Sequence, residues 1–107
     1  MRFRTWLIRA AAAAALAMMT MTCGVREDEL RCEEAAAHLA ECCAGFMPSI
    51  LDCTFVPADG CSPPHEPSIS IENSRCIDGL SCEQINKTDL CNRIVQAVQT
   101  NNPVTCP

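Results

Sequence analysis

The chain has 107 residues, of which 49% are hydrophobic and 20% are charged, and its formal net charge at pH 7 is −5. An acidic chain repels phosphate backbones and anionic lipid headgroups, so its charge argues against a nucleic-acid partner. The length suits one small domain, and a core of that size does not stabilise a fold without further constraints.

Residues 1–22 have the layout of a bacterial-type signal peptide. Arg2, Arg4 and Arg9 form a positive head, and an uncharged apolar run follows over residues 10–22. A membrane-spanning helix needs about 20 apolar residues, so a run this short is not expected to stay in the membrane. We expect the signal peptide to be removed, which leaves five basic and 13 acidic side chains and a net charge of −8.

Cys23 directly follows the apolar run and is the candidate for lipidation, as in a bacterial lipoprotein. A diacylated cysteine would anchor the protein to a membrane face. Thr20 and Thr22 depart from the usual sequence around such a cysteine. The alternative is soluble secretion after the small residues 15–17, with Cys23 left to pair. In either case residues 23–27 are predicted to form a tether to a domain of residues 28–107.

Ten cysteines in a short exported chain predict a disulfide framework. Several bridges of roughly 2–4 kcal/mol each would match the whole net stability of a typical domain. The eight cysteines expected to pair with one another are Cys32, Cys42, Cys43, Cys53, Cys61, Cys76, Cys82 and Cys91. If Cys23 is lipidated, Cys106 is the expected odd cysteine, and otherwise all ten can pair. The neighbours Cys42 and Cys43 point in different directions on a helix and are not expected to bridge each other.

The expected fold is small, disulfide-rich and mainly α, with three or four short helices and a Pro-rich loop. Good helix formers fill residues 28–43, with acidic residues first and Gly45 following at a position suited to a left-handed cap. Cys32, Ala36, Leu39 and Cys43 recur at helical spacing and share one face. The sequence therefore predicts the first helix over residues 28–43.

Several prolines and Gly60 in residues 46–67 exclude a long helix and predict turns and extended pieces. Ser70 is then placed to cap a helix over residues 71–79, and Ser81 and Gln84 form a capping box over a short helix. A last helix is predicted from residue 88 or 89, with a stripe of Cys91, Ile94, Val95 and Val98, and residues 101–103 end it.

The sequence contains no motif for a metal or a cofactor. It has no C-x-x-C pair, which argues against zinc binding and against thiol redox catalysis. His38 lies on the first predicted helix and His65 in the stiff segment 63–67, and no serine or cysteine nucleophile is assigned to either. A small hydrolase that uses one of these histidines is an alternative, but no catalytic residue is predicted and the chain is expected not to be an enzyme.

The main functional hypothesis is a structural or protein-binding scaffold that presents the loop of residues 46–67 to a protein partner. The binding candidates in this loop are Phe46, Met47, Phe55, Val56 and His65. Prolines pre-organise such a surface and lower the entropic cost of binding. The competing interpretation is that the apolar residues of the loop pack into the core.

The spacing C-x9-C-C-x9-C-x7-C from Cys32 to Cys61 is followed by Arg-Cys-Ile at residues 75–77 and Leu-Ser-Cys-Glu at residues 80–83. This pattern resembles small, uncharacterised cysteine-rich predicted lipoproteins of bacteria over residues 23–93. The resemblance implies export and a shared disulfide framework, with the bacterial outer membrane, periplasm or cell surface as the location. A soluble secreted inhibitor or toxin-like protein is the alternative.

Overall fold

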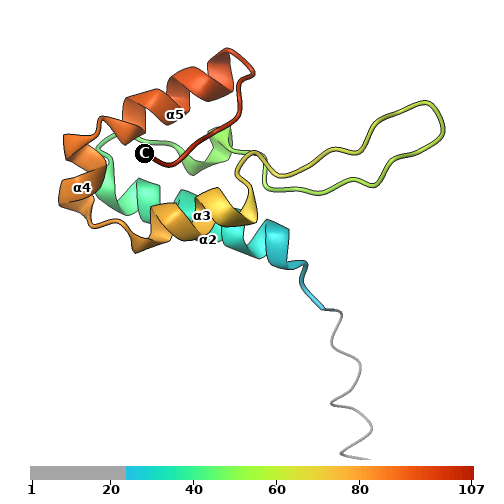
Figure 1. Cartoon of the computed structure of the whole chain (residues 1–107), viewed down its shortest axis with the longest axis horizontal. Coiled ribbons are helices and arrows are strands. Elements are labelled where there is room, and N and C mark those ends of the chain that lie inside the picture. The colour runs from blue at the N-terminus through green and yellow to red at the C-terminus, as the bar shows by residue number, and fades with distance from the viewer. Residues whose placement is uncertain (1–23) are drawn as a thin grey trace, which may run out of the picture.

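The computed structural model describes residues 24–107, in which four α-helices enclose a small core and one loop projects from it (Figure 1). The helices are α2 (Glu27–Cys42), α3 (Ile71–Gly79), α4 (Cys82–Lys87) and α5 (Leu90–Gln99), with a 3-10 helix η1 (Pro48–Ile50) between α2 and α3. The predicted mainly α, disulfide-rich fold with a Pro-rich loop is therefore confirmed. The predicted signal peptide and Cys23 lie outside the described residues.

Helix α2 begins and ends one residue earlier than the sequence predicts. Its first turn contains Glu27, Asp28 and Glu29, which suit the positive end of the helix dipole. The part of the predicted tether within the described chain is therefore residues 24–26. At the other end, Gly45 adopts a φ of +75° in the turn after the helix, a conformation that glycine adopts without steric cost.

The core is small and aliphatic. Small side chains lie where α2 and α3 pack together, with Ala35 and Ala36 on α2 and Ser74 on α3. Six larger side chains are at most 1% exposed: Leu39, Ile69, Ile77, Ile85, Leu90 and Ile94. Burying a side chain of this kind contributes about 1.5–3 kcal/mol to stability. A core with so few large side chains is small, as expected for a domain of this length.

Local capping determines where the second half of the chain becomes helical. The Ser70 hydroxyl accepts a hydrogen bond from the amide of Asn73 at the start of α3 (3.2 Å). At α4, Ser81 accepts from the Gln84 amide at 3.2 Å, and the Gln84 side chain accepts from the Ser81 amide at 2.9 Å. Both predicted helix starts are therefore confirmed, including the capping box. Helix α5 follows Asp89, which has a left-handed φ of +54°.

Four disulfides connect the elements: Cys32–Cys53, Cys42–Cys82, Cys43–Cys91 and Cys76–Cys106. The end of α2 is held on two sides, because Cys42 bonds to the start of α4 and Cys43 bonds to α5. As predicted, these neighbouring cysteines do not bridge each other.

The predicted pairing of Cys61 with another of the eight cysteines is wrong, whereas Cys106, whose pairing the sequence left open, forms a disulfide. Cys106 bonds to Cys76 of α3, with Cα atoms 6.1 Å apart, and its amide donates to Asn73 at 3.0 Å. The C-terminal tail reaches α3 by turning back over the core, where Val104 is 4% exposed. Cys61 is exposed and has no disulfide partner among residues 24–107.

Candidate functional site

Residues 54–66 form an arm of two antiparallel segments that extends away from the helices (Figure 1). Val56 and His65 exchange two backbone hydrogen bonds, with N···O distances of 2.9 and 2.8 Å. Nearer the tip, Asp59 and Ser62 form a second such pair at 3.3 and 2.8 Å. The arm is therefore a narrow hairpin with a defined pairing rather than an irregular loop.

The tip of the arm is a two-residue turn of Gly60 and Cys61. Gly60 has a φ of +51° and occupies the first central position, where type II′ hairpin turns require a positive φ. Pro57, Pro63 and Pro64 lack an amide hydrogen, so they donate no backbone hydrogen bond between the two pairs. They restrict the backbone instead, which keeps the arm extended with few internal bonds.

A disulfide and two hydrogen bonds hold the root of the arm. Cys53 is bonded to Cys32 of α2, with Cα atoms 5.5 Å apart. Next to it, the Asp52 amide donates to the Ser68 hydroxyl at 3.0 Å, and the Ser68 amide donates to the Asp52 carbonyl at 2.7 Å. Both segments of the arm therefore leave the core from fixed positions.

Asp52 also connects the root to the second segment of the arm. Its carboxylate accepts from the Thr54 amide at 3.0 Å and lies 2.9 Å from Nε2 of His65. The hydrogen bonds from the Thr54 amide and side chain hold the pKa of Asp52 below its ordinary value, and His65 lowers it further. Both partners of the Asp52–His65 pair are exposed, so we expect it to orient the arm more than to stabilise the whole fold.

The start of α2 holds the arm at Phe55. The Arg26 guanidinium carbon lies 3.7 Å from the centroid of the Phe55 ring, and Glu29 accepts a hydrogen bond from the Phe55 amide at 2.8 Å. Arg26 is in turn held by two hydrogen bonds to Asp28, at 3.0 and 2.9 Å. This contact raises the pKa of Arg26 and lowers that of Asp28, because each charge favours the other.

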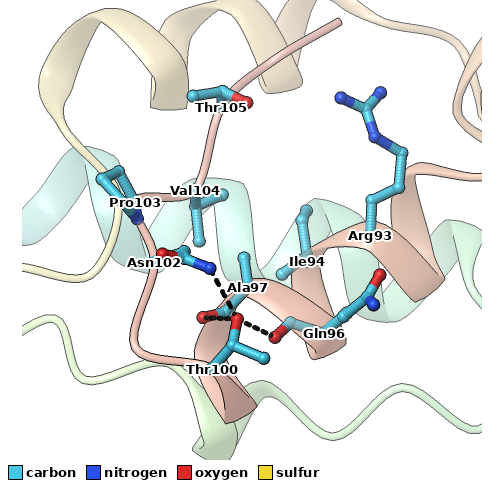
Figure 2. Close-up of a pocket in the computed structure, with 9 residues that line it drawn as sticks. All are labelled: Arg93, Ile94, Gln96, Ala97, Thr100, Asn102, Pro103, Val104 and Thr105. Carbon is cyan, nitrogen blue, oxygen red and sulfur yellow. Dashed lines mark hydrogen bonds between the residues drawn. The ribbon is translucent and has the colours of Figure 1, made fainter.

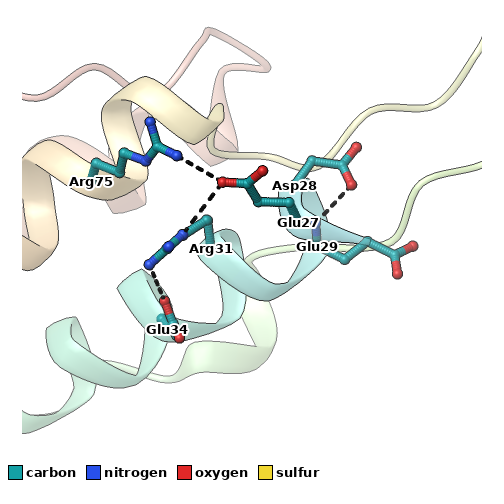
Figure 3. A network of polar contacts seen from close by, with 6 residues as sticks. All are labelled: Glu27, Asp28, Glu29, Arg31, Glu34 and Arg75. Carbon is teal, nitrogen blue, oxygen red and sulfur yellow. Dashed lines mark hydrogen bonds and ion pairs between the residues drawn. The ribbon is translucent and has the colours of Figure 1, made fainter. Parts of the chain in front are cut away.

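An ion-pair network joins α2 to α3 beside this contact (Figure 3). Glu27 lies 2.7 Å from the guanidinium of Arg75 on α3 and 3.9 Å from that of Arg31 on its own helix. Arg31 also contacts Glu34 at 3.1 Å. Solvent-exposed pairs of this kind contribute little individually, but together they fix the first turns of α2 on α3.

The five binding candidates of the loop fall into two groups. Phe46 packs against the core and Phe55 is half-buried next to Arg26. Met47 is 64% exposed and Val56 is 50% exposed, and His65 is exposed as well. The exposed apolar surface that the arm itself offers is therefore centred on Val56.

The sequence did not indicate the residues that hold the arm. Arg26, Glu29 and Ser68 are far in sequence from their partners on the arm, and no local pattern relates them. The one available signal was the Asp52-x-Thr54 spacing, which favours an Asp side chain accepting from the amide two residues on. That spacing identifies a turn but not the position of His65.

Both histidines are hydrogen-bonded. Nε2 of His38 lies 2.7 Å from the Leu80 carbonyl and connects α2 to the end of α3, while His65 contacts Asp52. In the described chain no group of three or more His, Cys, Asp or Glu side chains is arranged to hold a metal ion. None of the helices within residues 24–107 combines the length and apolar character needed to cross a membrane.

A hollow of about 270 Å³ lies between α5 and the C-terminal tail (Figure 2). The Thr100 hydroxyl donates to the Gln96 carbonyl at 2.8 Å and accepts from the Asn102 side chain at 2.9 Å. Ile94 and Val104 also line it and belong to the buried core. The hollow therefore follows from the way the tail returns over α5.

No protein-family model, no curated protein and no solved structure matches this chain. The arm and its root are accordingly interpreted from their own geometry.

Proposed function

We propose that the chain is an exported scaffold protein that binds a protein partner through the arm of residues 54–66. Four disulfides are compatible with an exported protein, because such bridges form and persist in oxidising compartments. The signal-peptide pattern of residues 1–22 supports the same compartment.

The observation that carries the proposal is the combination of a projecting arm with a fixed root. The Cys32–Cys53 bridge and the Phe55 contacts hold the root, while Val56 and the prolines beyond it face solvent. A segment that is already ordered loses less conformational entropy on binding than a free loop does. A groove on a partner that accepts an extended, proline-containing strand would fit this surface.

Cys23 is proposed to be acylated, which would place the protein on the outer membrane, in the periplasm or at the cell surface. The position of Cys23 after the apolar run and the resemblance to predicted bacterial lipoproteins support this proposal. The alternative is a soluble inhibitor or toxin-like protein. Cell fractionation distinguishes the two, because only the acylated protein is expected in the membrane fraction.

Site-specific photo-crosslinking in the producing cell tests the arm. A crosslinking residue replaces either Val56 on the arm or Lys87 at the end of α4; these side chains are both exposed and belong to different parts of the fold. We expect a discrete protein adduct from position 56 and none from position 87.

A shortened arm is the second control. Replacing residues 57–64 by Asn-Gly keeps the Val56–His65 pair and closes it with a tight turn. We expect this variant to keep its four disulfides and to lose the adduct from position 56. Equal crosslinking from both positions, or an adduct that survives shortening, contradicts binding through the arm.

A further inference from the structure

The chain that separates the proposed lipid anchor from the folded domain is very short. Helix α2 begins at Glu27, and Arg26 is its N-cap residue, whose carbonyl accepts from the Leu30 amide at 3.1 Å. The side chain of Arg26 is held as well, by Asp28 and by the Phe55 ring. Only Gly24 and Val25 therefore stand between Cys23 and a residue that is fixed to the fold.

This length limits the distance between the anchor and the arm. Three residues of extended chain span about 11 Å at most, so the Cα atom of Cys23 lies within that distance of Arg26. Arg26 contacts Phe55 at the root of the arm. An acyl chain on Cys23 would therefore bring the root of the arm to the level of the lipid headgroups.

Apolar side chains are exposed at this end of the domain. Val25 is 71% exposed and Leu30 is 40% exposed, which makes them two of the four large hydrophobic side chains that are exposed within residues 24–107. Exposed apolar side chains next to an anchor add buried area when they meet the interface of a bilayer.

Basic and acidic side chains both lie at this end of the domain. Three of the five basic residues of the described chain, Arg26, Arg31 and Arg75, lie at this end. Arg26 pairs with Asp28, and Figure 3 shows Arg31 and Arg75 paired with Glu27. The exposed acidic residues here include Glu66 and Glu72, which line a neighbouring hollow with Asp28 and Arg75. Glu33 and Asp52 are exposed as well and line another hollow at the root of the arm. This end therefore carries charges of both signs, and the orientation rests on the short tether and the exposed apolar side chains.

We propose that the first turn of α2 and the root of the arm form a membrane-facing surface, which a two-residue tether holds against a lipid bilayer. This inference rests on the proposed acylation of Cys23. It narrows the partner of the arm to proteins at the membrane surface, because the root of the arm cannot move away from the headgroups. The C-terminal end of α2 then points away from the bilayer. It lies about 24 Å from the N-terminal end, because the helix has 16 residues.

Two fluorescent reporters test the orientation on the full lipidated chain. Cys61→Ser removes the thiol of the arm tip, and Val56→Cys or Lys87→Cys then adds one thiol for labelling. Val56 adjoins Phe55, whereas Lys87 follows Asn86, whose side chain donates to the Cys42 carbonyl at the far end of α2 (3.5 Å). The protein is placed in phosphatidylethanolamine and phosphatidylglycerol vesicles that carry a nitroxide quencher on the headgroups.

We expect the reporter at position 56 to be quenched several-fold more strongly than the reporter at position 87. A matched variant with 20 Gly/Ser residues inserted after Gly24 should lose this difference, because its domain turns freely. Equal quenching of the two reporters with the native tether overturns the membrane-facing surface. Mass spectrometry and flotation are measured on the same samples, so a missing acyl group refutes the anchor, whereas a present one with equal quenching refutes the orientation alone.

Discussion

Arg26 lies over the ring of Phe55, with its guanidinium carbon 3.7 Å from the ring centroid. This contact joins the N-cap of α2 to the root of the arm, and the adjacent hydrogen bond from the Phe55 amide to Glu29 reinforces it. The start of the first helix therefore determines where the arm leaves the domain, which makes Phe55 more important for the arm than for the core.

Replacing Phe55 by alanine should loosen the arm without unfolding the domain. The ring contact is worth about 0.5–1 kcal/mol at a partly exposed site, and the Cys32–Cys53 bridge remains in the variant. We expect faster hydrogen exchange at the amides of Val56 and His65, while the amide of the buried Ile94 keeps its protection. Unchanged exchange in the arm would show that Arg26 and Phe55 do not hold it.

Removing the bridge between α3 and the tail should destabilise the fold. Cys76 and Cys106 are separated by 30 residues, and a loop of that length corresponds to about 3–4 kcal/mol in the chain-entropy treatment of disulfides. Cys106→Ser should therefore lower the free energy of unfolding by roughly 2–4 kcal/mol, measured by urea denaturation under non-reducing conditions.

Cys61→Ser is the matched control for this measurement. Cys61 is exposed at the tip of the arm and forms no bridge within the described residues, so the substitution should leave the unfolding curve unchanged. Under native conditions a maleimide should label Cys61 alone among the nine cysteines of residues 24–107. Labelling at residue 106, or a loss of stability in Cys61→Ser, would contradict the observed pairing.

The elements that the sequence predicts well are those with local signals. Ser70, Ser81 and Gln84 cap helices in the structure as their spacing indicates, because a capping side chain reaches an amide two or three residues away. The predicted helix over residues 71–79 agrees with α3 at both ends. In these segments both partners of the interaction that starts the helix lie within three residues of each other in the sequence.

The disulfide pairing and the root of the arm depend on contacts between distant segments. Cys106 pairs because the tail returns over the core, and Cys61 stays unpaired within the described chain because the hairpin carries it away from the helices. Similarly, no spacing in the sequence relates Arg26 to Phe55 or Asp52 to His65. Such contacts follow from the fold, so one sequence read locally does not predict them.

Ser81→Ala tests how much the capping box contributes. The variant loses the hydroxyl that accepts from the Gln84 amide, at the start of a helix of six residues. We expect a loss of about 1 kcal/mol in the free energy of unfolding. Ser62→Ala, on the exposed arm, is the control and should change this value little. Equal effects of the two substitutions would show that the box contributes nothing specific.

Asp78 near the end of α3 should make the stability depend on pH. Partial burial raises the pKa of its carboxyl above the ordinary value of 3.8, the nearby Glu34 raises it further, and His38 and Arg31 lower it. The carboxylate also stands in the last turn of α3, where the helix dipole disfavours negative charge. Between the ordinary pKa and the raised one, the folded state binds more protons than the unfolded state, so stability falls as pH rises through that window.

Asp78→Asn should remove this penalty. The variant should be more stable than the parent at pH 7, and its advantage should disappear at about pH 3, where the carboxyl of the parent is protonated in both states. Urea denaturation at the two pH values measures the difference, with Asp59→Asn on the exposed arm as the matched control. A stabilisation of equal size at both pH values would mean that the gain comes from helix capping by asparagine rather than from the loss of a disfavoured charge.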